Sequence, residues 1–265
     1  MIGVVRSELG RLSRRSVIIG WFGLTAALAM IINVVMFQVI KSSSVPPANG
    51  PGVSFPSEAR LLSEHGIVAG LGSASSILGV VALSFWAIAT STDYSTGLIR
   101  VLASAQPVRW RLILGKWLAL GVFTAAATTV ALVANLVAAP LAAQSAGYSP
   151  SAWGNDLIPL LLGAWINLFG ALLIWGTIGL ALATLTRSSG VAIGVGVGYV
   201  LLGESLITSV ASSTRDWLPG TTMSAIASGG TAAVSYGAAL SLGVTYLVLT
   251  LAAATIVVVR RDITD

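Results

Sequence analysis

The chain has 265 residues, a formal net charge of +5 and no cysteine. Only 9% of its residues are charged and 55% are hydrophobic, whereas soluble domains carry roughly 25% charged residues, so the composition predicts an all-α integral membrane protein with one transmembrane domain over residues 1–265. The lack of cysteine excludes disulfides and thiolate metal sites, and no stretch is long, polar and basic enough to be a nucleic-acid-binding domain.

Residues 1–16 are predicted to form an amphipathic helix that lies on a membrane surface. Its apolar positions recur at helical spacing and are Ile2, Val5, Leu9 and Leu12. The arginines of this segment fall on other faces, where they would meet anionic headgroups. The alternative is a basic flank that only sets the topology. The apolar run that follows is too long for a cleavable signal peptide, so we expect it to be retained.

Six apolar stretches are long enough to cross a bilayer, which takes about 20 residues. They are predicted at residues 17–40, 67–90, 112–139, 157–185, 191–210 and 237–259. Eleven lysines and arginines fall in the tails and in the second and fourth connections, whereas the other connections hold three, Lys41, Arg60 and Arg215. Because cytoplasmic loops are enriched in these residues, both termini are predicted to be cytoplasmic, in a multi-pass protein of the inner (plasma) membrane.

The connection after the second span is predicted to contain a short helix, at residues 92–106, that lies along the membrane surface. Oxygens that can cap its start are carried by Thr92, Asp93 and Ser95. Its apolar stripe consists of Leu98, Val101 and Leu102. Pro107 would end this helix and open the next one. A short helix held between two spans would be suited to receive force from a cytoplasmic partner.

Three basic residues follow this helix, at the start of the third span: Arg109, Arg111 and Lys116. Long basic side chains at the end of a spanning helix extend to the membrane surface. We therefore expect all three to reach the interface.

Polar side chains inside the predicted spans are candidates for a substrate pathway. The four candidates are Asn33, Asn135, Asn167 and Glu204. For the three amides the alternative is an interhelical hydrogen bond, worth about 0.6 kcal/mol. Glu204 would line an outward cavity, pair with Arg215 or lie at the outer interface, and a carboxylate within a span indicates function by default.

The fifth span contains a stripe of glycines every four residues, Gly190, Gly194 and Gly198. The segment resembles a nucleotide-binding loop, but it lies in an apolar span with no preceding strand. We therefore interpret it as a small-xxx-small stripe that lets two helices approach closely.

After this span, residues 211–235 are predicted to hold a short re-entrant element, because Pro219 and Gly220 mark a turn and the apolar run that follows is too short to span.

The sequence carries no pattern of an enzyme active site or a metal site. A phosphate-binding loop and a His-Glu-x-x-His motif are both absent. The chain's one histidine, His65, falls in an outer connection, where we interpret it as solvated. The chain is therefore expected not to be an enzyme and to bind no cofactor of its own.

Residues 92–116 resemble the second cytoplasmic segment of permeases of the type 2 ATP-binding-cassette exporters. In that family an acidic residue is followed by a Gly-Thr pair, a Leu-rich stretch, Pro, Arg, an aromatic or basic residue and Lys. The matching residues here are Asp93, Gly97, Leu102, Pro107, Arg109, Trp110, Arg111 and Lys116. The departures are Asp93 for the usual Glu and Leu98 for the usual Thr. The architecture of the whole chain resembles these permeases as well.

The resemblance implies a permease subunit of an ATP-driven exporter. Two such chains, identical or related, would surround one pathway, and two separate ATPase subunits would bind beneath them and hold the ATP and Mg²⁺. Residues 92–106 would be the coupling helix, with Asp93, Gly97, Leu98, Val101, Leu102, Pro107 and Arg109 as its coupling residues. The few charges and several tryptophans of the spans are compatible with an amphipathic drug, antibiotic or lipid as the substrate. The alternatives are a secondary transporter or channel, a non-transporting membrane scaffold and a membrane enzyme.

Overall fold

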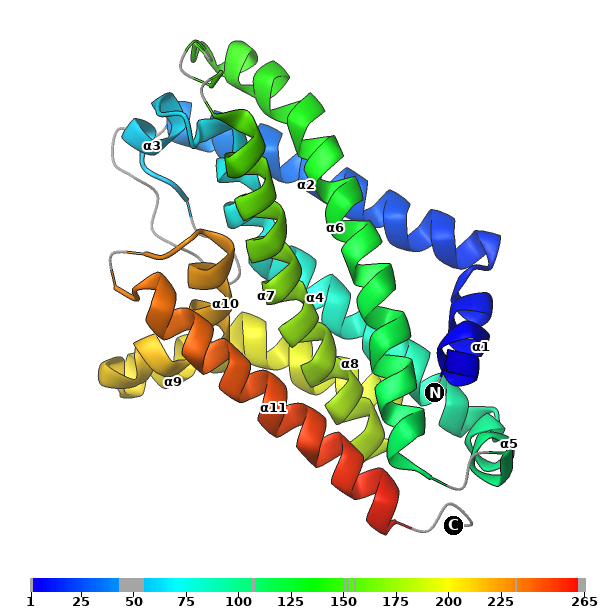
Figure 1. Ribbon diagram of the computed structural model, residues 1–265. Coiled ribbons are helices and arrows are strands. Elements are labelled where there is room, and N and C mark those ends of the chain that lie inside the picture. Colours follow the sequence, from blue (N-terminus) through cyan, green and yellow to red (C-terminus); the bar gives the residue numbers. More distant parts are fainter. Residues whose placement is uncertain are drawn as a thin grey trace.

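The computed structural model describes residues 2–42, 55–105, 108–149, 151, 153–154, 156–231 and 233–261. Within these residues the chain is helical and contains no strand (Figure 1). Its α-helices are α1 (Ile2–Leu12), α2 (Arg15–Ser42), α3 (Glu58–Leu62), α4 (Gly66–Ser95), α5 (Leu98–Ala105), α6 (Trp110–Ala146), α7 (Leu157–Thr186), α8 (Ser189–Gly198), α9 (Glu204–Val210), α10 (Pro219–Ala227) and α11 (Tyr236–Arg260). A π-helix, η1 (Tyr199–Gly203), joins α8 to α9, and a 3-10 helix, η2 (Ser212–Trp217), precedes α10.

Six of the described helical segments are long and apolar enough to cross a membrane. They are α2, α4, α6, α7, α11 and the continuous segment Ser189–Val210, so the six predicted spans are confirmed. The largest difference is at α6, which ends at Ala146 instead of residue 139 and contains Pro140. Proline removes one helix hydrogen bond, but the turn after it is held by the burial of Ala142, Ala143 and Ala146.

Helix α4 lies at the centre of the bundle. Of its most apolar stretch, 72% is buried inside the chain, against 17% for the corresponding stretch of α11. Its closest neighbour is α7, and the two helices interlock. A Cβ added to Gly79 of α4 would lie 2.3 Å from the Trp175 ring of α7, and one added to Gly176 of α7 would lie 2.4 Å from the Trp86 ring of α4. Each indole therefore fills the space that the glycine of the other helix leaves.

The bundle has two distinct ends. One end holds α1, α5 and both chain termini (Figure 1), and we call it the α5 end. Arg109, before α6, donates to the carbonyl of Arg261 after α11, and Arg261 donates to Leu185 O near the end of α7. The opposite end, which we call the α3 end, holds α3 and α10, where Arg60 donates to Ser228 O. The position of both termini at the same end is the one expected for a chain with an even number of spans.

The predicted helix at residues 92–106 starts later than expected. Helix α4 continues through Ser95, and the hydroxyls of Thr92 and Ser95 donate to carbonyls in their own helix instead of capping a new one. The turn comes at Gly97, which has a φ of +69°. Glycine adopts this left-handed conformation without steric cost, so α5 begins at Leu98. Pro107, expected to end the helix, lies outside the described residues.

The segment predicted to be re-entrant, residues 211–235, contains η2 and α10. Helix α10 has nine residues, begins with Pro219 and packs between α4, α7 and α11. Met223, Ala225 and Ile226 are almost fully buried in this packing. The short apolar run therefore forms part of the core of the chain.

Candidate functional site

Four charged side chains from three helices meet at the α5 end of the bundle. We call them the charge network: Glu8 and Arg11 of α1, Asp93 of α4 and Lys116 of α6. Lys116 Nζ lies 3.0 Å from Glu8 Oε2 and 2.8 Å from Asp93 Oδ2. Arg11 donates through Nη1 to Asp93 Oδ1 at 2.9 Å and through Nη2 to Glu8 Oε1. Two acidic and two basic groups thus pair with one another.

The packing of α1 against α6 brings this network together. Val5 and Leu9 pack against the core and Leu12 is buried in it, which confirms the predicted amphipathic pattern of α1. Helix α1 can approach α6 closely because residue 115 is glycine, whose added Cβ would lie 2.6 Å from Val4 Cγ1. Glu8, on the same side of α1, then lies over Lys116.

Three of the four members of the network are shielded from water. Glu8, Asp93 and Lys116 are 4%, 3% and 6% exposed, and Lys116 Nζ makes a third contact, to Ala89 O at 3.1 Å. The contacts to Glu8 and to Ala89 O are hydrogen bonds, and the contact to Asp93 is an ion pair. Removing one partner from a buried ion pair costs about 3–5 kcal/mol because it leaves an uncompensated charge. The network therefore fixes α1, α4 and α6 to one another.

Two features of this network differ from the sequence interpretation. Lys116 was expected to reach the membrane surface, which is wrong, because it lies on the side of α6 that faces α1 and α4 and finds two carboxylates there. Glu8 was not recognised at all. The available signal was that Glu8 is the one acidic residue among the four arginines of the N-terminal tail, three positions before Arg11.

Helix α5 covers the network. Ile99 and Leu102 line a cavity of about 10 Å³ together with Glu8, Asp93 and Lys116. Val101 points the other way and is 63% exposed. The stripe of Leu98, Val101 and Leu102 is therefore not one surface: Leu102 faces the network, Leu98 is half-buried, and Val101 remains accessible to a partner.

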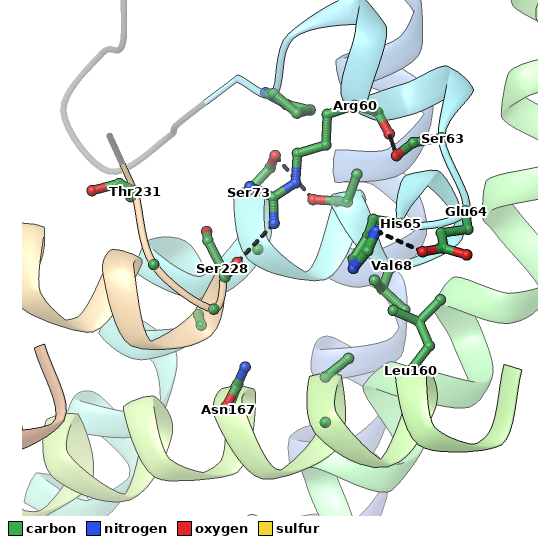
Figure 2. A pocket seen from close by; sticks show the side chains of 18 of the residues that line it. Arg60, Ser63, Glu64, His65, Val68, Ser73, Leu160, Asn167, Ser228 and Thr231 are labelled. Carbon is green, nitrogen blue, oxygen red and sulfur yellow. Dashed lines mark hydrogen bonds and ion pairs between the residues drawn. The ribbon is translucent and has the colours of Figure 1, made fainter. Parts of the chain in front are cut away.

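A second site lies at the α3 end, where a pocket of about 930 Å³ opens between α3, the first turns of α4 and α7, and the loop after α10. Figure 2 shows Arg60 above this pocket, with its guanidinium donating to Ser228 O at 2.7 Å. His65 and Glu64 lie on another wall, 3.8 Å apart. Groups of both charge signs line the pocket, so it suits a polar or amphipathic molecule.

Of the four predicted pathway residues, Asn167 lines this pocket. Its Oδ1 accepts a hydrogen bond from the Tyr236 hydroxyl of α11. Arg60 and His65 also line the pocket. The sequence analysis placed both in an outer connection and assigned neither of them to a site. Their shared cavity depends on how α3 and α7 meet, which the sequence pattern does not show.

Asn33 and Asn135 line neither the pocket at the α3 end nor the small cavity below α5. They lie in the packing between α2, α4 and α6. Both are fully buried. Asn33 Nδ2 donates to Asn135 Oδ1 at 2.9 Å, and Asn135 Nδ2 donates to Ile67 O at 2.7 Å. This is the interhelical hydrogen bond that the alternative interpretation predicted for these amides.

Glu204 has a fourth role, different from the three that the sequence left open, which were a cavity, an ion pair with Arg215 and the outer interface. Its Oε1 accepts from the backbone N–H and the hydroxyl of Thr221, each at 2.8 Å. These groups belong to the first turn of α10, where a negative charge is favourable. Gly220 provides the necessary space, since its added Cβ would lie 2.0 Å from Glu204 Oε2. Glu204 thus caps α10.

The glycine stripe of the fifth span does not pack inside this chain. Within the part of the chain that the structure describes, no atom of another element lies within 4 Å of a Cβ added to Gly194 or Gly198, and Gly190 meets only Ser188 Oγ. The close approach is made on the other face, where Ala192 is fully buried and Gly196 contacts Leu83 of α4. A packing role for the stripe would require another molecule.

Among the described residues, no three His, Asp or Glu side chains are grouped closely enough to hold a metal ion. The sequence matches no model of a protein family. A search of curated proteins also finds no match.

Proposed function

We propose that this chain is the membrane-spanning permease subunit of an ATP-driven exporter and that separate ATPase subunits drive it. Its resemblance to the type 2 ATP-binding-cassette permeases implies two such chains around one pathway. The phosphate-binding loop that ATP hydrolysis needs is absent from the sequence, so the energy would come from another polypeptide. The α5 end would face the cytoplasm, because it carries the excess of lysine and arginine.

The observation that carries this proposal is the position of α5. The helix is linked to α4 by the turn at Gly97, lies over the charge network and presents Val101 outward. A push on α5 would therefore reach α4 directly, and α1 and α6 through the network. Force applied at one short helix would move three helices, one of which is the most buried span.

Export is favoured over the other transport classes. The chain lacks the Glu-Ala-Ala…Gly loop of importer permeases. A secondary transporter would use ionisable groups in its spans to couple ions. Glu204, the carboxylate that best fitted such a role, caps α10 instead.

Co-purification with an ATPase tests the proposal. The full chain is affinity-purified from its native membranes in mild detergent, and Mg-ATP hydrolysis and the co-eluting polypeptides are measured. We expect the wild type to retain a polypeptide with a phosphate-binding loop and to show hydrolysis. Val101→Asp should lose both, because burying an unpaired charge in an interface costs several kcal/mol and about 1.4 kcal/mol already lowers affinity tenfold.

The matched control is Ser16→Asp, which adds the same charge at an exposed position near the start of α2. It should retain the ATPase. A wild-type eluate without ATP hydrolysis would overturn the proposed function. Equal recovery with wild type and Val101→Asp would show instead that α5 is not the docking element.

A further inference from the structure

The pocket at the α3 end, which we call the α3 pocket, carries separate groups of opposite charge. Its volume of about 930 Å³ lies within the range of roughly 300–1,000 Å³ that small-molecule sites occupy. Arg60 supplies a positive charge, and the carboxylates of Glu64 and Asp156 supply two negative ones. Figure 2 shows the His65 ring between the Arg60 guanidinium and the Glu64 carboxylate. A ligand in this pocket therefore meets a cationic group and acidic groups at different places.

The positive group is fixed in position and keeps donors for a ligand. Arg60 Nη2 donates to Ser228 O, the carbonyl that follows α10. Within the part of the chain that the structure describes, no carboxylate forms an ion pair with Arg60. A guanidinium has five N–H donors, so one contact to a carbonyl leaves several of them. They suit a phosphate or a carboxylate, to which arginine binds through paired hydrogen bonds.

The negative groups suit a primary ammonium. Glu64 is half exposed and lies 3.8 Å from His65 Nδ1, and Asp156 is exposed before the first turn of α7. Across the described residues, neither acid is ion-paired with a lysine or an arginine. Carboxylate oxygens accept hydrogen bonds from an –NH₃⁺ group, whereas quaternary ammonium groups are bound by cages of aromatic rings. Phe55 is the one aromatic residue among the described lining residues.

The position of the α3 pocket indicates that such a ligand comes from the membrane. The pocket lies where the spanning helices α4 and α7 begin, which is the depth of the lipid headgroups. Gly163 and Asn167 of α7 line it. The residue before each of them, Leu162 and Ile166, is exposed, as is Ile158 one turn earlier. This apolar stripe begins beside the pocket and runs along the span, so acyl chains could follow it while the headgroup stays in the pocket.

We infer that the α3 pocket binds the headgroup of a zwitterionic lipid that carries a phosphate and a primary ammonium. The phosphate would bind Arg60, and the ammonium would bind the carboxylates of Glu64 and Asp156. The inference deepens the proposed function, on which it rests for the role of this lipid as the exported substrate. Binding itself requires no ATPase, so a failure to bind the lipid would leave the ATPase partner unaffected.

Lipid binding to the purified full chain tests the inference. Thermal unfolding is followed by tryptophan fluorescence in neutral detergent, and bound lipid is counted by native mass spectrometry. Phosphatidylethanolamine should raise the unfolding midpoint more than phosphatidylcholine, which has no N–H donor, or phosphatidylglycerol, which has no positive charge. Equal binding of the three lipids would overturn the inference. Equal stabilisation by glycerophosphoethanolamine, which has the headgroup without acyl chains, would overturn the lipid as the source.

Filling the pocket provides a test that changes no charge. A Cβ added to Gly163 meets no atom within 4 Å, so Gly163→Leu should fold and occupy the space of the ligand. We expect it to weaken phosphatidylethanolamine binding about tenfold or more. Gly23→Leu is the matched control, because Gly23 also has open space around it, lies in the spanning helix α2 and does not line the pocket. Equal binding by the two variants would show that the lipid does not occupy the α3 pocket.

Removing the carboxylates should change which headgroup is preferred. The variant Glu64→Gln/Asp156→Asn keeps Arg60 and loses both negative groups, so it should bind phosphatidylglycerol at least as tightly as phosphatidylethanolamine. The matched control is Glu58→Gln/Asp216→Asn, which removes two exposed carboxylates outside the pocket. It should keep the preference of the wild type. A preference for phosphatidylethanolamine that is unchanged in Glu64→Gln/Asp156→Asn would overturn the assignment of the ammonium to these carboxylates.

Discussion

At the scale of single residues, the charge network shows how a polar cluster is accommodated in an apolar bundle. Lys116 lies in a helix whose most apolar stretch has a mean hydropathy of 1.9. Its ammonium group donates to Glu8 and to Ala89 O and forms an ion pair with Asp93. Arg11 contacts the remaining oxygens of both acids. Each charged group thus depends on the others.

Removing Lys116 tests this dependence. In Lys116→Met the two carboxylates share Arg11 alone, and we expect the free energy of unfolding in detergent to fall by about 3–5 kcal/mol. Arg111→Met, which removes the same charge type from an exposed position on the same helix, should change it by no more than about 0.5 kcal/mol. Denaturant unfolding of both variants gives the comparison. Equal stability of the two variants would show that the network does not stabilise the fold.

Glu204 can be tested in a similar way as the cap of α10. Glu204→Ala removes the acceptor of Thr221 N–H and should lower the free energy of unfolding by about 1–2 kcal/mol, as the loss of a helix cap does. Glu204→Gln keeps an acceptor oxygen and should cost less than about 1 kcal/mol, the contribution of the charge near the helix start. If Gln proves as damaging as Ala, Glu204 stabilises α10 through its charge and not through its acceptor oxygen.

At the scale of secondary-structure elements, the turn between α4 and α5 decides how α5 is presented. Gly97 adopts a φ of +69°, and no atom lies within 4 Å of a Cβ added there. The glycine is therefore required by the backbone conformation and not by lack of space.

Substitution with alanine isolates this backbone effect. Gly97→Ala places a Cβ in the left-handed region and should destabilise the chain by about 1–2 kcal/mol. Gly10→Ala is the opposite case, because Gly10 lies in a regular helix with open space around it, and it should stabilise by about 0.5–1 kcal/mol. Thermal unfolding in detergent measures both. A Gly97→Ala variant that gains stability, as Gly10→Ala should, would contradict the assigned turn.

At the scale of the whole molecule, one interface organises the bundle. Helices α4 and α7 bury Trp86 and Trp175 against each other's glycines. The outer helices are less enclosed, with 17% of the apolar stretch buried for both the fifth span and α11. These surfaces are left for lipid or for the second chain that the proposed function implies.

The orientation of the whole molecule leads to a prediction that single cysteines can test. The chain is free of cysteine, so Ser104→Cys in α5 and Ser145→Cys at the opposite end of α6 introduce unique labels at exposed positions. In intact cells an impermeant thiol reagent should label Ser145→Cys and spare Ser104→Cys. After the membrane is permeabilised, both should react. Labelling of Ser104→Cys in intact cells would refute the orientation derived from the basic residues.

The amino-acid sequence by itself determined the spans, the amphipathic pattern of α1 and the presence of a short helix near residue 100. These features depend on local properties, because the length of an apolar run decides whether it can cross a membrane. The start of α5 was missed because the hydroxyls that can cap a helix also bond back to their own helix. The local sequence pattern cannot show whether these hydroxyls will cap a new helix or bond to a carbonyl of their own helix.

Tertiary structure alone decided which residues meet. Glu8 and Lys116 are 108 positions apart. The glycines that pack closely within this chain include Gly79, Gly176 and Gly196 and do not include the regular stripe in the fifth span. A spanning helix is apolar on nearly all its faces, so its hydrophobic pattern does not reveal which face turns inward. The rotation and axial shift of each helix follow from the close packing of large side chains against small ones. Those contacts exist only once the helices have assembled.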